Sequence, residues 1–235
     1  MRTGFLRIAA LLIILGSATG TLMGQAPTQD PPGKFFDLTI GLGINAHFTH
    51  SVANYINQVA QPGLDQKIGI IVSAPEFFAS AELQLTDDWS AGIEYSLLVK
   101  SYAIRDRSGY ARSDFSYQVH MPAVVIHRLV FGEGYRVKFG GGIGYYFCSF
   151  RQQFQPYGND ETLKADGPGL KLEAVGNTKF DDTFYGSIGV DLRWGFLGTL
   201  ERGDAVGAGS RAGELPSMSF FNAGIKFGLT FQLSE

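Results

Sequence analysis

The segment from Phe221 to Phe231, with the sequence FNAGIKFGLTF, alternates at every position between two kinds of residue. Its odd positions carry Phe, Ala, Ile, Phe, Leu and Phe, and its even positions carry Asn, Gly, Lys, Gly and Thr. Successive side chains of a β-strand point to opposite faces, so this pattern predicts a strand with one apolar and one polar face. Ten steps of about 3.3 Å, tilted by about 40°, span about 25 Å, the height of the apolar band of an outer-membrane β-barrel.

The N-terminus resembles a secretory signal peptide. Arg2 and Arg7 flank an apolar run at 8–15, and small residues follow up to Ala26. This run is shorter than the roughly 20 apolar residues that a transmembrane helix needs. We therefore predict a signal peptide over 1–26, cleaved after Ala26 or, as a second choice, after Gly20. The remaining residues, 27–235, suit a single β domain.

Composition limits the partners of the mature chain. Without Arg2 and Arg7, 17 basic residues remain against 22 acidic ones, a formal charge of −5. This balance argues against nucleic acid as a partner, because nucleic-acid binding relies on basic surfaces. Cys148 is the only cysteine, so no internal disulfide can form, and we interpret it as a small filler on the polar face.

Seven further segments alternate in the same way as 221–231. They lie at 36–48, 76–85, 89–100, 114–128, 135–148, 168–176 and 184–196. With the last segment they make eight strands, which predicts an eight-stranded antiparallel up-and-down transmembrane β-barrel.

The fourth of these strands has the weakest pattern. We place one row of residues on its apolar face, namely Phe115, Tyr117, Val119, Met121 and Val125. The opposite row carries Ser116, Gln118, His120 and Arg128, so His120 is expected in the lumen and His127 outside. Pro122 removes one donor from the strand ladder and favours a bulge or an open edge.

Connection lengths alternate along the chain. The turns near Asp87, Gly132 and Asn177 are short, whereas the connections at 51–75, 105–113, 151–167 and 199–217 are longer. Outer-membrane barrels have short periplasmic turns and longer extracellular loops. Within 51–75, apolar residues at helical spacing (Val52, Tyr55, Ile56, Val59) predict a short amphipathic helix. Such a stripe more often packs locally than binds a partner.

Alternation by itself does not say which face points inward, since a soluble lipocalin-like carrier has the same period in the opposite sense. The glycines occur mainly among the charged residues, and a narrow eight-stranded barrel needs small residues inside. Aromatic residues close both ends of the apolar rows, as in the interfacial girdles of membrane barrels. We therefore expect the polar face inside and the apolar face toward outer-membrane lipid.

The inward orientation gathers charged residues in one narrow lumen. The candidate luminal charge network consists of Glu82, Glu94, Arg136, Lys138, Lys171, Glu173, Asp191, Arg193 and Lys226. Because a buried unpaired charge costs several kcal/mol, opposite charges there are expected to pair in a structural network. The functional alternative is a narrow gated pore for ions or small solutes, opened by switching pairs such as Glu94 with Arg136.

No set of residues has the spacing of a catalytic, cofactor-binding or metal site, so we predict no enzyme and no cofactor. The sequence leaves three functions open. The first is a non-enzymatic integral outer-membrane barrel with a structural role or with a protein partner bound by its extracellular loops. The others are the gated pore and a soluble periplasmic carrier. Oligomeric state, partner and solute are not fixed by the sequence.

Three segments also resemble a known family. They are LTDDWSAGIEY at 85–95, SYQVHMPAVV at 116–125 and FGGGIGY at 139–145. These segments are similar to the PorT-like outer-membrane β-barrel proteins of Bacteroidota, and the resemblance extends over nearly the whole mature chain. It implies an outer-membrane location and, because some of these proteins are linked to protein secretion, a secretion-associated role. It implies no functional residue.

Overall fold

The computed structural model describes residues 34–60, 68–105, 112–155, 159–202 and 215–234. The predicted signal peptide at 1–26 lies outside these ranges. No helix in the described ranges is long and apolar enough to cross a lipid bilayer.

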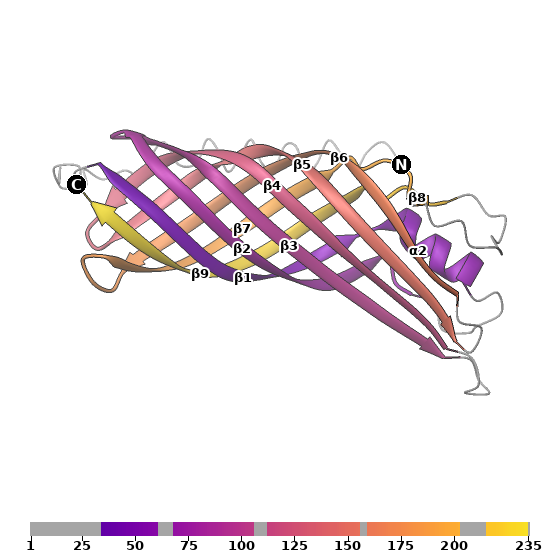
Figure 1. Ribbon diagram of the computed structural model, residues 1–235. Helices are drawn as coiled ribbons and strands as arrows, with labels where there is room; N and C mark the ends of the chain where they lie inside the picture. The colour runs from indigo at the N-terminus through magenta and orange to yellow at the C-terminus, as the bar shows by residue number, and fades with distance from the viewer. Residues whose placement is uncertain (1–33, 61–67, 106–111, 156–158, 203–214, 235) are drawn as a thin grey trace, which may run out of the picture. The chain divides into compact units, whose positions relative to one another are not determined.

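Eight antiparallel strands close into a barrel, as the alternation predicted (Figure 1). Each is paired with two neighbours in the ring β1-β2-β3-β4-β5-β6-β7-β9, and β9 pairs with β1 to close it. A two-residue strand, β8 (Glu201–Arg202), adds to β6 at Leu163 and Lys164. The barrel strands are β1 (Phe35–Phe48), β2 (Ile71–Thr86), β3 (Trp89–Arg105), β4 (Arg112–Gly132), β5 (Tyr135–Gln155), β6 (Asn159–Lys179), β7 (Phe184–Gly195) and β9 (Phe220–Ser234).

One end of the barrel, here called the turn end, carries the short connections. β2 and β3 are joined through Asp87 and Asp88, and β4 and β5 through Glu133 and Gly134. Gly134 has φ +75°, a left-handed backbone that glycine adopts without a steric penalty. The opposite end, here called the loop end, carries the helix α2 (His50–Tyr55), which continues as the π-helix η1 (Ile56–Ala60). The expected helix in the first long connection is thus confirmed.

Strands β3 to β6 are longer than the sequence predicted. β4, β5 and β6 each have 21 residues, whereas about 9 to 11 residues cross a bilayer. The connection predicted at 151–167 is therefore strand in its described residues, and Arg105, Arg112 and Ser113 of the connection predicted at 105–113 belong to β3 and β4. Figure 1 shows β3 to β6 continuing past the other strands at the loop end. The prediction failed at 151–167 because polar residues stand on both faces, with Arg151 and Asp160 outward and Gln152 and Glu161 inward, which weakens a period of two.

The outer wall is apolar around the barrel. Ile44, Ile93 and Ile143 are 65%, 64% and 67% exposed, and apolar side chains on the other strands are about half exposed. Soluble monomers rarely expose apolar surface on this scale. The inner face carries the polar residues, so the predicted orientation of the two faces holds for every strand except β4.

Strand β4 contradicts the prediction, because its inner and outer faces are exchanged relative to those predicted. Phe115, Tyr117, Val119 and Met121 are buried inside the barrel, as is His127, whereas Val124 and Ile126 are exposed outside. The half of β4 nearer the loop end lies beyond the apolar belt, where the interior is apolar and the exterior polar. Pro122 is paired with Tyr95 on β3, but no pair joins Met121 or Pro122 to β5, as its missing donor predicts.

Candidate functional site

The lumen contains all nine residues of the predicted charge network. Each is at least nine-tenths buried, and together they come from β2, β3, β5, β6, β7 and β9. Alternation places them inside because every second residue of each strand points to the barrel axis. Glycines on the inner face leave room for the larger side chains of the lumen. A Cβ at Gly41 would lie 2.5 Å from the ring of Phe78. The Lys226 ammonium lies over this ring, 4.0 Å from its centroid.

Ion pairs at the turn end of the lumen begin with Asp37. Its carboxylate accepts hydrogen bonds from Arg136 and from Lys138, the latter at 2.9 Å. Lys138 also lies 3.0 Å from Glu82, whose carboxylate contacts His127 Nδ1 at 3.2 Å. These contacts join β1, β2, β4 and β5 across the lumen.

The network continues through His127 to the middle of the barrel. His127 Nε2 lies 2.9 Å from Glu173, and Glu173 lies 2.6 Å from Lys171. Lys171 is paired with Glu94 at 2.5 Å, and Lys226 contacts the same Glu94 oxygen at 2.9 Å.

Arg193 completes the network toward the loop end. Its Nη2 donates to Glu76 at 2.8 Å and to Glu94 at 2.9 Å. Asp191 Oδ2 lies 2.8 Å from Arg193 Nε, without the alignment of a hydrogen bond. One continuous chain of polar contacts therefore connects all eight barrel strands.

The sequence missed three members of this network. Asp37 and Glu76 lie in the predicted strands 36–48 and 76–85 but were not included in the network, because the pairing across the barrel is set by register rather than by local sequence. His127 was expected outside and is the basic group between Glu82 and Glu173. The pair suggested for a gate, Glu94 with Arg136, is not formed: Arg136 binds Asp37, and Glu94 binds Lys171, Lys226 and Arg193.

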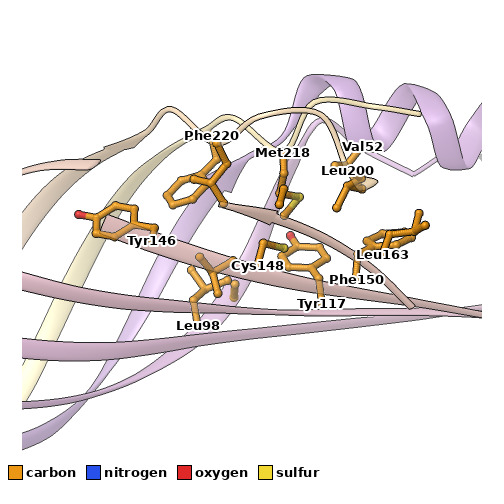
Figure 2. Packing of buried hydrophobic residues seen from close by; sticks show 14 of the residues in the cluster. Val52, Leu98, Tyr117, Tyr146, Cys148, Phe150, Leu163, Leu200, Met218 and Phe220 are labelled. Atoms are coloured by element: carbon orange, nitrogen blue, oxygen red, sulfur yellow. The ribbon is translucent and has the colours of Figure 1, made fainter. Parts of the chain in front are cut away.

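An apolar cluster, here called the plug, fills the lumen at the loop end (Figure 2). It draws on α2, η1, the long strands and the segment between β7 and β9. Its members are Val52, Ile56, Ala74, Leu98, Phe115, Tyr117, Val119, Met121, Tyr146, Cys148, Phe150, Leu163, Ala165, Leu197, Leu200, Met218 and Phe220. The helix therefore packs locally, as its apolar stripe predicted.

The plug lies directly against the charge network. Arg193 Nη1 lies 3.5 Å from the sulfur of Met121, and the rings of Tyr146 and Phe220 stack with centroids 6.2 Å apart. Cys148 faces the lumen as predicted, although its neighbours are apolar rather than polar. Burial raises the pKa of the Cys148 thiol to about 12 and raises the pKa of the Tyr117 hydroxyl strongly.

A small cavity lies between the plug and the turn end. The cavity beside Glu82, Glu94, Lys138 and Lys226 has a volume of about 30 Å³. A cavity measured in this way needs about 10 to 15 Å³ to hold one water molecule. This cavity can therefore hold water molecules but not a lipid or a sugar.

The outer wall changes from apolar to aromatic and polar residues where the long strands leave the apolar belt. Tyr95 and His120 are hydrogen-bonded at 2.5 Å, and the Tyr145 hydroxyl donates to Asp166. Beyond this aromatic row, the outward residues of β4, β5 and β6 include Gln118, Arg151 and Lys164, all exposed. Aromatic residues with a polar tip are typical of the interface between lipid and water.

Comparisons with known proteins give structural neighbours only. No family model matches the chain, and no curated protein matches it significantly. The structure is similar to Ail of Yersinia pestis in complex with a heparin analogue (12% identity, TM-score 0.45, 86% of this chain and 99% of that chain covered). Others are Neisserial surface protein A (9%, 0.48, 83% and 96%) and the outer membrane protein OprG from Pseudomonas aeruginosa (10%, 0.47, 87% and 98%). Likenesses at this level carry no conclusion about function.

Proposed function

We propose that the protein is an integral outer-membrane β-barrel that is non-enzymatic, does not conduct, and presents its long strands outside the cell to bind a protein partner. The apolar outer belt with its aromatic row supports the membrane location. The turn end then faces the periplasm and the loop end the exterior.

The observation that carries this proposal is the filled lumen. Ion pairs occupy its middle and turn end, and the plug closes its loop end. A pore needs a continuous water path, and a lipid carrier needs an apolar cavity of several hundred Å³. A cavity of about 30 Å³ serves neither. The buried polar residues are also out of reach of a substrate, which supports a non-enzymatic role.

The long strands supply the binding surface in this proposal. About half of each 21-residue strand exceeds the length needed to cross the membrane, and the plug supports the inner face of this continuation. A rigid sheet held clear of the membrane suits recognition of a protein. The resemblance to PorT-like proteins supports a partner in secretion.

Expression of the full chain in a Gram-negative host tests the membrane assignment. We expect the protein in the outer-membrane fraction, with a gel mobility that shifts only after boiling, because a closed barrel in detergent unfolds only on heating. Recovery from the periplasm without detergent and without a mobility shift would contradict the proposal.

A further inference from the structure

The barrel wall splits between β2 and β3 at the loop end. Pairs join these strands from Thr86↔Trp89 as far as Glu76↔Leu98. Beyond this point β3 continues to Arg105, paired only with β4, while β2 stays paired with β1 as far as Ile71. Figure 1 shows the loop end of β3 at the margin of the long strands.

The sequence accounts for this split. Pro75 follows the last β2–β3 pair, and its nitrogen carries no hydrogen to donate to β3. Two residues farther along β2, the carbonyl of Ser73 accepts a hydrogen bond from Lys100 Nζ at 2.8 Å. The Lys100 side chain therefore occupies the Ser73 carbonyl. If β2 and β3 had stayed paired, a backbone N–H of β3 would have bound this carbonyl instead.

Among the residues that the structure describes, 99–105 of β3 consequently form a free sheet edge. Within the described part of the chain, β4 is the only strand paired with them. Every second residue of an edge strand directs its N–H and C=O away from the sheet. Ser101 and Ala103 are exposed, and Tyr102 and Ile104 are half-buried against the plug. Backing by the plug keeps this edge extended and rigid.

We propose that the edge at 99–105 binds an extended segment of another protein, which adds to the sheet as a further strand. This inference rests on the proposed function, because the edge lies outside the cell only if the barrel spans the membrane as assigned. Unpaired backbone groups in a row recognise an extended backbone. The added strand would place apolar side chains beside Tyr102 and Ile104, and small or polar ones beside Ser101 and Ala103.

A second copy of the chain fits this edge poorly. Two barrels in one membrane have strands tilted by about 40°, and facing strands related by a two-fold axis would cross at about 80°. An antiparallel ladder centred on Tyr102 would also place the Lys100 ammonium beside Ile104. A partner free to align its own segment avoids both obstacles.

A labelled peptide with the sequence RSDFSYQV, copied from 112–119, is a suitable probe. This segment already pairs with β3 on its other side and directs Phe115 and Tyr117 to the inner face. The full chain, first shown to be folded by its heat-dependent mobility, is titrated into the peptide in detergent micelles. We expect saturable binding by fluorescence anisotropy, and binding at least tenfold weaker for the same peptide with alternate amides N-methylated.

Two adjacent proline variants place the binding on this edge. Neighbouring residues direct their N–H groups to opposite sides, so one of Ser101→Pro and Tyr102→Pro removes a donor from the free edge. Of these two variants, we expect the one that removes the free-edge donor to weaken peptide binding at least tenfold. Its gel mobility should still shift on boiling. Ser101→Ala and Tyr102→Phe, the matched controls, should bind like the unchanged protein.

The outcomes separate this inference from the proposed function. Equal binding of the N-methylated peptide, or no binding to a protein that shows the mobility shift, would overturn the edge proposal alone. Absence of the shift would overturn the membrane assignment first. If Ser101→Cys cross-links two copies into a dimer, and the dimer no longer binds the peptide, the edge would be assigned to a second copy instead.

Discussion

Arg193 is the residue on which the loop end of the charge network most depends, since its guanidinium contacts Glu76, Glu94 and Asp191. We predict that Arg193→Met lowers the free energy of unfolding by about 3 to 5 kcal/mol, because buried carboxylates lose their partner. Urea unfolding in micelles, followed by gel mobility, measures this change.

Arg151→Met is the matched control for that variant. Arg151 is paired with Asp160 on the exposed outer wall, where an ion pair contributes between 0 and about 1 kcal/mol. Combining Arg193→Met with Glu76→Gln should recover part of the loss, since it removes one of the orphaned carboxylates. Equal losses for the two single variants would show that the lumen is not a buried network.

Cys148 offers a probe of the plug. Because burial raises the pKa of its thiol to about 12, little thiolate exists in the folded barrel at neutral or mildly alkaline pH. We expect maleimide labelling of the folded protein to be much slower than that of the boiled protein at every pH between about 7 and 9, although its rate also rises with pH as the small thiolate fraction grows. After boiling, the rate should rise about tenfold per pH unit until the ordinary thiol pKa of about 8.5 is reached. Fast labelling of the folded protein would contradict a closed plug.

At the scale of elements, η1 and α2 hold the plug in place. Ile56 is 1% exposed, whereas Gln58, two residues along the same helix, is exposed. We predict that Ile56→Asp raises the rate of Cys148 labelling at least tenfold, since a buried carboxylate without a partner expels the helix from the plug. The mobility shift should survive, because the strand ladders and the ion pairs remain.

Gln58→Asp is the control for the helix variant. It adds the same charge at an exposed position and should leave the labelling rate unchanged. If both variants accelerate labelling equally, the effect comes from charge near the loop end and not from loss of packing.

For the whole molecule, the filled lumen predicts an absence of channel activity. We expect no steady conductance steps when the purified protein is added to a planar lipid bilayer, because ion pairs cross the lumen and the described residues of the plug fill its loop end. Glu94→Gln should likewise produce none while the plug is intact. Regular steps from the unchanged protein, altered by Glu94→Gln, would favour the gated pore.

Several strands could be predicted residue by residue from the sequence. In β7 and in the parts of β9 and β5 at 221–233 and 135–145, the lipid-facing row is apolar or glycine and the inner row is polar or glycine, so a period of two identifies both the strand and its faces. The nine charged residues were assigned to the lumen on the same ground. In β4 both faces are apolar near the membrane, and the pattern could not distinguish them.

The sequence by itself determined that this chain forms eight two-faced strands, because the period of the side chains is a local property of the backbone. It also determined which face is polar on seven of them. Only the tertiary structure decided which charges meet, since Asp37 and Arg136 are 99 residues apart and are brought together by barrel closure and register. It alone decided the plug and the free edge of β3, because both arise where strands of unequal length end at different heights.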